Sequence, residues 1–224
     1  MTDTIIVSGG DIHSDFALDF LKKNINRTGR ENISLIAADR GLEFFMKIGI
    51  LPDVAVGDFD SLCAEGKKFL ESKKNEMEII RLKPEKDDSD TQSAMNLAVS
   101  RGAKDIAILG VTGRRVDHLM ANFGLLILAQ KKGVRVALVD RYNYITLAAS
   151  GTVLKKKEQF GRYVSFFSIG GDVSGLTLEG FKYPLHEHWL TAADSGLTVS
   201  NEIKDEQAKI TYTSGQLMMI MSRE

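Results

Sequence analysis

Aspartates recur at points in the sequence where short β-branched runs end. Asp39 follows one such run, Asp58 and Asp60 follow the next, and the acidic segment 86–90 follows a third. A single Asp in such a place is also a common turn or cap residue. Ligands of open parallel sheets bind beyond the carboxyl ends of the strands, so three acidic groups at equivalent positions predict a binding site at that edge.

The pair Asp58 and Asp60, in Val-Gly-Asp-Phe-Asp-Ser (56–61), predicts a metal ion. In an extended segment alternate residues point the same way, which brings both carboxylates within reach of one ion. Carboxylates so close repel unless a cation or a proton lies between them. Hard oxygen ligands and a phosphate substrate favour Mg²⁺, and therefore phosphoryl-type transfer. The alternative is a turn in which Asp58 caps a helix that starts near Ser61 while Asp60 is solvated.

A second group of residues spans 110–118, with the sequence Gly-Val-Thr-Gly-Arg-Arg-Val-Asp-His. A glycine-containing turn from a strand into a helix presents backbone N–H groups at the positive end of the helix dipole, which suits phosphate. Arg114 and Arg115 add charged donors. The segment is neither a Walker A loop nor a G-x-G-x-x-G motif. His118 is either a structural residue or a ligand contact, and Gly9-Gly10 either allows close backbone approach or makes a turn.

The elements that must position these residues show a regular order. From Thr4 to about Val139, β-branched runs alternate with helical stretches, which is typical of βαβ units around a largely parallel sheet. Helical spacing of apolar residues predicts helices at Asp90–Arg101 and Asp117–Lys131. Capping of these helices is the alternative role for Asp90 and Asp117. The predicted strands are Thr4–Val7, Ile33–Ala37, Val54–Val56, Glu78–Arg81, Ile106–Leu109 and Arg135–Val139.

After Val139 the sequence pattern changes to short extended runs separated by glycines. This pattern, without a good amphipathic helix, predicts an antiparallel sandwich or barrel of roughly 75 residues. We therefore expect two domains with a boundary near Asp140–Asn143. The predicted strands are Asn143–Ala148, Thr152–Lys155, Tyr163–Ile169, Leu176–Leu178, Leu197–Ser200, Lys209–Tyr212 and Leu217–Met221.

Composition excludes several classes of function. The 224 residues include 29 Lys and Arg against 30 Asp and Glu, so the surplus of positive charge that binds nucleic acid is missing. Cys63 is the only cysteine, which excludes an intrachain disulfide and a cysteine metal site and fits a reducing cytoplasm. No apolar run approaches the ~18 residues of a membrane helix, and the acidic first segment is unlike a secretion signal. We expect neither a nucleic acid nor a membrane as partner.

The motifs, taken together and in order, resemble those of the thiamine pyrophosphokinase family. The resemblance covers nearly the whole chain. It rests on Ala-Asp-Arg-Gly (38–41), Val-Gly-Asp-Phe-Asp-Ser (56–61), Lys-Asp-Asp-Ser-Asp (86–90), Gly-Arg-Arg-Val-Asp-His-Leu-Met-Ala-Asn (113–122), Thr-Leu-Glu-Gly-Phe-Lys-Tyr (177–183) and Ser-Gly-Leu-Thr-Val-Ser-Asn (195–201).

This resemblance implies a homodimeric enzyme that transfers the terminal pyrophosphoryl group of ATP to the hydroxyl of thiamine, giving thiamine diphosphate and AMP. It implies an α/β fold in which a Rossmann-like three-layer domain, residues 1–140, binds ATP and Mg²⁺ on a mainly parallel sheet. An antiparallel β-sandwich domain, residues 143–224, is expected to bind thiamine and form the dimer, so that each site uses both subunits. Mg²⁺ is the expected cofactor and ATP the co-substrate.

The resemblance also assigns residues. The expected catalytic residues are Asp39, Asp58, Asp60 and Asp90, and the last three are the expected metal ligands. The expected nucleotide-binding residues are Arg40, Lys86, Asp87, Thr112, Gly113, Arg114, Arg115, Asp117, His118 and Asn122. The expected thiamine contacts are Ser200, Asn201 and Tyr183, with Phe181 and Trp189 as further aromatic candidates for stacking on a ring of thiamine.

The sequence departs from the family at a few of these positions. Arg40 and Arg114 stand where many members have glycine, and Tyr183 stands where others have tryptophan. Two other functions stay open at this point: a pyrophosphokinase for another alcohol, such as a hydroxymethylpterin, and a non-catalytic regulator that binds a nucleotide. The first shares the metal and phosphate machinery, so only the C-terminal domain separates it from a thiamine enzyme.

Overall fold

The computed structural model describes residues 1–83, 88–113, 115–194 and 196–224. The chain divides into two compact units, Met1–Arg141 and Tyr142–Glu224. The division falls inside the interval 140–143, where the change in sequence pattern predicts the boundary. Within the described ranges, none of the helices combines the length and the hydrophobicity that crossing a bilayer requires.

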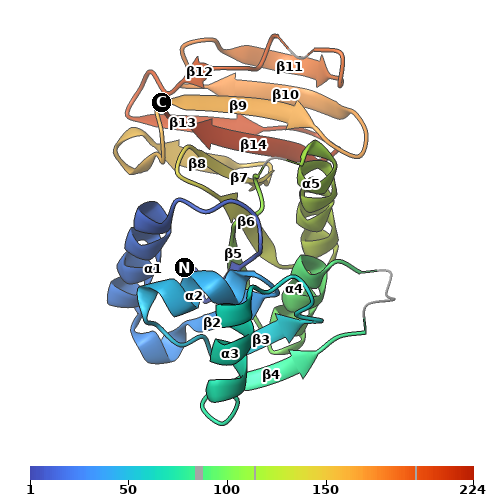
Figure 1. Cartoon of the computed structure of the whole chain (residues 1–224). Coiled ribbons are helices and arrows are strands. Elements are labelled where there is room, and N and C mark those ends of the chain that lie inside the picture. The colour runs from blue at the N-terminus through green and yellow to red at the C-terminus, as the bar shows by residue number, and fades with distance from the viewer. Residues whose placement is uncertain (84–87, 114, 195) are drawn as a thin grey trace. The chain divides into compact units, whose positions relative to one another are not determined.

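The N-terminal unit is built on a parallel sheet, as the alternating pattern predicts (Figure 1). The strand order is β6-β5-β1-β2-β3-β4, so the winding direction reverses between β1 and β5. In open sheets this reversal opens a crevice where ligands bind. The strands are β1 (Thr4–Val7), β2 (Ser34–Ala38), β3 (Val54–Gly57), β4 (Glu78–Arg81), β5 (Asp105–Leu109) and β6 (Arg135–Val139).

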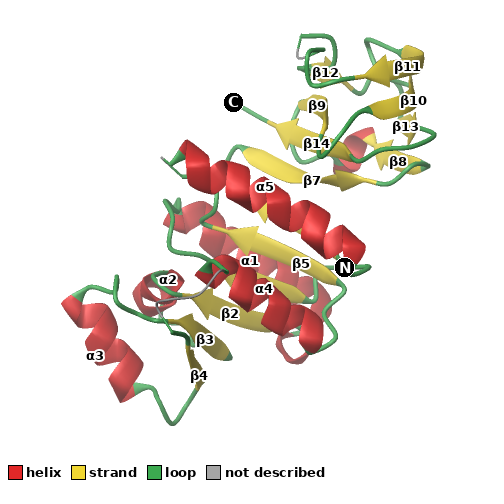
Figure 2. Ribbon diagram, turned by 90° about the vertical axis from the view of Figure 1, so that its right-hand side faces the viewer, coloured by secondary structure: helices red, strands yellow, loops and turns green. Residues whose placement is uncertain are grey.

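Helices cover both faces of this sheet, which explains why the inner strands are buried along almost their whole length. Right-handed crossovers place α1 and α2 on one face and α4 and α5 on the other (Figure 2). The bounds are α1 (Ser14–Thr28), α2 (Gly41–Ile48), α3 (Ala64–Ser72), α4 (Asp90–Ser100) and α5 (Val116–Lys131), with a short 3₁₀ helix η1 (Arg30–Asn32).

Helices α4 and α5 confirm the two predicted helices to within one residue at each end. Asp90 is not the N-cap of α4, because Ser89 holds that position and its Oγ accepts the backbone N–H of Gln92 at 3.2 Å, but Asp90 lies in the first turn, where an acidic residue complements the helix dipole. Asp117 lies in the first turn of α5 and accepts the backbone N–H of His118 at 2.9 Å.

The C-terminal unit contains two antiparallel sheets, β12-β9-β14-β7 and β11-β10-β13-β8, which confirms the predicted sandwich. The bounds are β7 (Asn143–Ala148), β8 (Thr152–Lys155), β9 (Tyr163–Ser168), β10 (Val173–Glu179), β11 (Leu185–Leu190), β12 (Asn201–Glu202), β13 (Gln207–Thr211) and β14 (Leu217–Ser222), with a 3₁₀ turn η2 (Lys156–Glu158).

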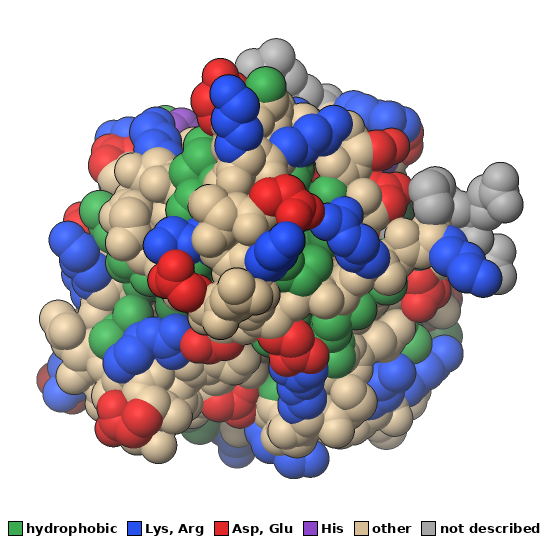
Figure 3. Space-filling view, turned by 60° about the horizontal axis from the view of Figure 1, so that its bottom comes forward, with side chains coloured by type: hydrophobic (Ala, Val, Ile, Leu, Met, Phe, Trp, Pro, Cys, Tyr) green, Lys and Arg blue, Asp and Glu red, His purple; other side chains and the backbone are tan. Residues whose placement is uncertain are grey.

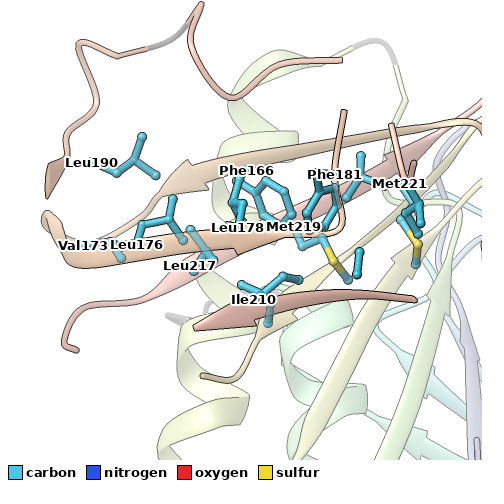
Figure 4. Close-up of a cluster of buried hydrophobic side chains, with 14 residues drawn as sticks. Phe166, Val173, Leu176, Leu178, Phe181, Leu190, Ile210, Leu217, Met219 and Met221 are labelled. Carbon is cyan, nitrogen blue, oxygen red and sulfur yellow. The ribbon is translucent and has the colours of Figure 1, made fainter. Parts of the chain in front are cut away.

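The core of this unit lies between its two sheets (Figure 4). Phe166 of β9 is fully buried and meets Phe181 edge to face, with ring centroids 5.5 Å apart. Met219 of β14, Leu178 of β10 and Ile210 of β13 complete the contact between the sheets. Phe181 is therefore a core residue, with 3% of its surface exposed, and its candidacy as a ring that stacks on thiamine is wrong.

Two parts of the C-terminal prediction are also wrong. Leu197–Ser200 form turns and bends, and the strand is Asn201–Glu202, because Ser200 has a φ of 57° and cannot continue an extended run. The strand Leu185–Leu190 was not predicted. Its apolar pattern is interrupted where Glu187 adopts a φ of 45° and the pairing with β10 shifts register.

We predict that Phe166→Ala lowers the free energy of unfolding of the C-terminal unit by about 3–5 kcal/mol, because it opens a cavity in a closely packed core. Urea unfolding, followed by circular dichroism, measures the effect. The matched control is Val153→Ala on β8, where the side chain is 50% exposed, and we expect a change within about 0.5 kcal/mol there. Equal effects of the two variants would contradict the core role of Phe166.

Candidate active site

The loops at the carboxyl ends of the strands of the N-terminal unit enclose a cavity of about 640 Å³. It lies at the reversal point between β1 and β5, where open sheets bind ligands. The loops after β1, β2 and β5, the first turn of α4 and the first two turns of α5 supply its walls. The lining residues are Ser8, Gly9, Gly10, Asp11, Asp39, Arg40, Ser89, Asp90, Thr91, Gly110, Val111, Gly113, Arg115, His118, Ala121 and Asn122.

Glycines let the loops after β1 and β5 touch through their backbones. The N–H of Gly10 donates to the carbonyl of Gly110 at 2.9 Å, and a Cβ on Gly10 would lie 2.4 Å from that oxygen. Gly110 itself has a φ of 72°, which favours glycine. Close backbone approach is therefore the role of Gly10, and it forms one wall of the cavity.

The acidic loops after β2 and β3 converge in the same way. One carboxylate oxygen from each of Asp39, Asp58 and Asp60 lies within 4.8 Å of the others. Gly57 makes this possible because a Cβ there would lie 3.1 Å from the Cα of Asp39. The predicted closeness of Asp58 and Asp60 is confirmed, and Asp39, which was expected at the same edge but not among the metal ligands, lies with them.

The geometry expected for Asp58 and Asp60 is wrong in its detail. Phe59 between them is not extended but has a φ of 62°, and the N–H of Asp60 donates to Asp58 Oδ1 at 3.1 Å. A bulky residue in this conformation costs free energy. Phe59 is held there because its ring is buried, with the guanidinium of Arg81 5.6 Å from the ring centroid.

The alternative in which Asp58 caps the next helix is also wrong. Helix α3 begins at Ala64, and its N-cap is Cys63, whose Sγ accepts the N–H of Gly66 at 3.3 Å. Asp58 lies five residues before this cap, so its carboxylate does not cap α3 and lies instead with those of Asp39 and Asp60.

Asp39 has the environment that a cation would complement. Its Oδ2 accepts a hydrogen bond from the hydroxyl of Ser61, and its Oδ1 is buried with no hydrogen-bond partner among the described residues. Burial raises the pKa of Asp39, and the charges of Asp90 and Asp58 raise it further, while Ser61 and the N–H of Arg40 oppose the shift. An unpartnered carboxylate oxygen beside two further carboxylates fits a hard divalent cation such as Mg²⁺.

Asp90 lies at the same cavity but outside the group formed by Asp39, Asp58 and Asp60. It is the first residue of α4, and its charge acts on the pKa of Asp39, so the two carboxylates face one region. Asp88 is turned to its own helix, where it accepts hydrogen bonds from Gln92 and Asn96.

The basic residues line the other walls. Arg40 lies beside the acidic group, with its guanidinium 3.8 Å from Glu43 Oε2. Arg115 pairs with Asp117, at 3.1 Å between Nε and Oδ1, and this hydrogen bond lowers the pKa of Asp117 to about 2. Both side chains are mostly exposed, so a phosphate group can reach Arg115 and exchange for its present partner.

The turn between β5 and α5 is fixed from within. Asn122 donates from Nδ2 to the carbonyl of Val111 at 2.9 Å, so its side chain holds this turn while it lines the cavity. Gly113 and His118 also line the cavity, and Thr112 lies half-buried in the same turn. The predicted residues Lys86, Asp87 and Arg114 lie outside the described residues.

Sequence reasoning missed part of this site. Asp11 follows β1 and lines the cavity, so the rule that identified the other acids could have found it. Ser8 lines the same wall and hydrogen-bonds to Thr91 of α4 at 2.6 Å between the two hydroxyl oxygens. No sequence pattern pairs two hydroxyls 83 residues apart.

The residues predicted to contact thiamine lie together in the C-terminal unit. Asn201 is buried, its Oδ1 accepts the N–H of Tyr183 at 3.0 Å, and its Nδ2 donates to the carbonyl of Tyr183 at 2.7 Å. Tyr183 is 55% exposed. The N–H of Ser200 donates to Ser165 Oγ at 3.0 Å. Trp189 is exposed and donates from Nε1 to Asp172. Asn201 thus holds the backbone from which Tyr183 projects.

On the face shown in Figure 3, basic and acidic side chains are interspersed and form no large patch of one sign. This distribution agrees with the near balance of charges in the sequence. A nucleic-acid surface would gather Lys and Arg, so this face does not resemble one.

Comparisons with known proteins agree on one family. The model described as "Thiamin pyrophosphokinase, catalytic domain" matches residues 26–138, and the model described as "Thiamin pyrophosphokinase, vitamin B1 binding domain" matches residues 151–217. The chain is 32% identical, over 194 residues, to the thiamine pyrophosphokinase of Bacillus subtilis (strain 168), which covers 87% of this chain and 89% of that protein.

Solved structures are similar over almost the whole chain. The crystal structure of thiamine pyrophosphokinase from Bacillus subtilis superimposes with a TM-score of 0.84 at 30% identity and covers 99% of each chain. The thiamin pyrophosphokinase of Geobacillus thermodenitrificans gives a TM-score of 0.82 at 30% identity and covers 99% of this chain and 97% of its own.

We predict that Gly10→Ala destabilises the N-terminal unit by about 1–3 kcal/mol, because the new methyl group forces the loops after β1 and β5 apart. Thermal unfolding measures the change. Gly124 in α5 is the matched control, since a Cβ there meets nothing within 4 Å. Gly124→Ala should stabilise the helix by about 0.5–1 kcal/mol. A Gly10→Ala protein as stable as the wild type would contradict the backbone contact.

Proposed function

The chain belongs to the thiamine pyrophosphokinase family, and on this premise we propose that the cavity of its N-terminal unit binds ATP with Mg²⁺. The protein is an enzyme of thiamine pyrophosphoryl transfer. The comparisons favour neither a pyrophosphokinase for another alcohol nor a non-catalytic regulator.

The observation that carries the nucleotide and metal proposal is the group formed by Asp39, Asp58 and Asp60, with the unpartnered Oδ1 of Asp39. These carboxylates would hold Mg²⁺, and Asp90 lies at the same cavity. When bound, the ion neutralises and orients the phosphates. On the other side, Arg40 and Arg115, which line the cavity, would donate to phosphate oxygens, and the positive end of the α5 dipole would favour the same groups.

The reaction requires orientation more than covalent chemistry. The hydroxyl oxygen of thiamine forms a bond to the β-phosphorus of ATP, the bond from that phosphorus to the oxygen bridging to the α-phosphate breaks, and AMP leaves with that oxygen. The hydroxyl proton passes to one of Asp58, Asp60 or Asp90. In a loose transition state the base contributes little. Most of the rate acceleration would therefore come from aligning the acceptor hydroxyl opposite the leaving AMP.

The C-terminal unit would supply the acceptor contacts. Tyr183 offers an exposed aromatic face for the cationic thiazolium ring, and Ser200 lies in the adjacent segment. Asn201 would act through Tyr183, because its amide is already bonded to the Tyr183 backbone. This assigns Asn201 a positioning role in place of the direct contact expected from the sequence.

The remaining parts of the proposal concern assembly and location. A homodimer that shares its sites between subunits is inferred from the resemblance. The exposed apolar residues Tyr183, Leu197 and Val199 give the C-terminal unit a surface that association could cover. The cytoplasm is the proposed compartment because Cys63 is the only cysteine.

We predict that purified protein incubated with Mg²⁺, ATP and thiamine gives thiamine diphosphate and AMP in equal amounts, separated by chromatography. A chelator should abolish both products. Asp58→Asn should lose about 100-fold or more in kcat/KM, since even partners outside the ligand shell are worth 10–100-fold. Asp19→Asn, an exposed position in α1, is the control. ADP as the product, or near-normal turnover in folded Asp58→Asn, would contradict the proposal.

We predict that Ser200→Ala raises the KM for thiamine about 2–10-fold, the worth of one hydrogen bond, and leaves the KM for ATP unchanged. Steady-state kinetics with each substrate varied in turn measure the two constants. The control is Ser174→Ala, which removes a hydroxyl that hydrogen-bonds to the hydroxyl of Ser214 at 2.8 Å. Equal rises in both KM values would remove Ser200 from the acceptor pocket.

A further inference from the structure

Ser61 connects the two acidic loops of the active site through its side chain. It lies in the turn after β3, and its hydroxyl donates to Oδ2 of Asp39, which follows β2 and is 22 residues away in sequence. Ser61 is exposed, and its hydroxyl is directed to the half-buried carboxylate of Asp39. The contact therefore joins the carboxylate of Asp39 to an exposed residue that is not part of the hydrophobic core.

The hydrogen bond removes the rotational freedom of the Asp39 carboxylate. The backbone of Asp39 is already fixed, with a φ of 47° and its N–H bonded to the carbonyl of Val56 at 2.8 Å. With Oδ2 held by Ser61, Oδ1 is the oxygen that has no partner among the described residues. Oδ2 of Asp39 thus accepts the hydrogen bond from Ser61, and Oδ1 is left to bind a cation.

Holding the loop in place is a task that other contacts already perform. Glu43 of α2 accepts the N–H of Cys63 through Oε1 at 2.8 Å, only two residues after Ser61. Phe59 is buried two residues before it, and Asp58 accepts the N–H of Asp60. Because these three contacts fix the turn 58–63, the Ser61 hydroxyl is not required for its shape.

We propose that Ser61 is a positioning residue for the divalent cation, orienting Asp39 so that Oδ1 faces the ion. This inference rests on the proposed function, which places the cation at Asp39, Asp58 and Asp60. Side chains that orient metal ligands through a hydrogen bond affect metal affinity while they leave the fold unchanged. Ser61 is not among the residues that line the cavity, and its hydroxyl donates to Asp39, so its removal should act on the requirement for metal and not on the binding of thiamine.

The test compares two variants of equal shape. Ser61→Thr retains the hydroxyl, whereas Ser61→Val replaces it with a methyl group. Binding of Mn²⁺ to the full-length protein without nucleotide, measured by electron paramagnetic resonance, is expected to weaken about 10-fold or more in Ser61→Val. Ser61→Thr should bind as the wild type does. Ser72→Ala is the control, because that exposed hydroxyl bonds only to the carbonyl of Phe69 in its own helix.

Kinetics supply the second readout. The Mg²⁺ concentration for half-maximal rate should rise in Ser61→Val by the same factor as the Mn²⁺ dissociation constant, with an unchanged KM for thiamine and an unchanged melting temperature. Ser61→Ala repeats the measurement if Ser61→Val does not fold.

Asp58→Asn distinguishes failure of this inference from failure of the proposed function. If Asp58→Asn loses Mn²⁺ binding and Ser61→Val binds as the wild type does, the positioning role of Ser61 is overturned and the metal site stands. If the wild type binds no Mn²⁺, both are overturned. Equal weakening in Ser61→Thr and Ser61→Val would also overturn the proposal, because the hydroxyl would then be irrelevant.

Discussion

Three carboxylates that lie within 4.8 Å of one another repel, and the N-terminal unit is arranged to hold them there. The parallel sheet delivers Asp39 and Asp58 to the same edge, and Gly57 lets their backbones approach. Two residues adopt left-handed conformations for this purpose, Asp39 and Phe59. Such conformations cost about 1–3 kcal/mol each and persist only where the surrounding structure enforces them. The buried ring of Phe59 supplies that enforcement.

The opposite wall of the cavity has the complementary chemistry. Backbone contact between Gly10 and Gly110 keeps side chains out of the reversal point, and Gly113 and His118, on either side of the start of α5, line the same space. Arg115 is paired with Asp117 on the surface, where a phosphate can compete for it. One wall needs positive charge and the other accepts negative charge. A metal bound to a polyphosphate carries both charges, so the ligand that we propose would match both walls.

Much of this arrangement could be predicted from sequence because it follows local rules. Strand periodicity and the position of acids after strands placed Asp39, Asp58, Asp60 and Asp90 at one edge of the sheet, where Asp39 and Asp90 line the cavity and Asp58 and Asp60 lie beside Asp39. The hydrogen bond between Ser61 and Asp39 could not be predicted, since it joins two loops across 22 residues. The left-handed Phe59 reversed the expected geometry without separating its neighbours, because burial of an aromatic ring outweighed its preference for extended backbone.

In the C-terminal unit the failures have a common cause. Glu187 and Ser200 both adopt positive φ: the strand that contains Glu187 was not predicted, and a strand was wrongly predicted to end at Ser200. Asn201 follows Ser200, and its amide takes the place of a strand partner for both backbone groups of Tyr183. Residues that were all predicted to be ligand contacts therefore differ in what they do in the structure: Asn201 holds the backbone, and Tyr183 presents an exposed ring. If this segment binds the acceptor as we propose, acceptor specificity would depend on the rigidity of the segment as well as on the atoms that touch the acceptor.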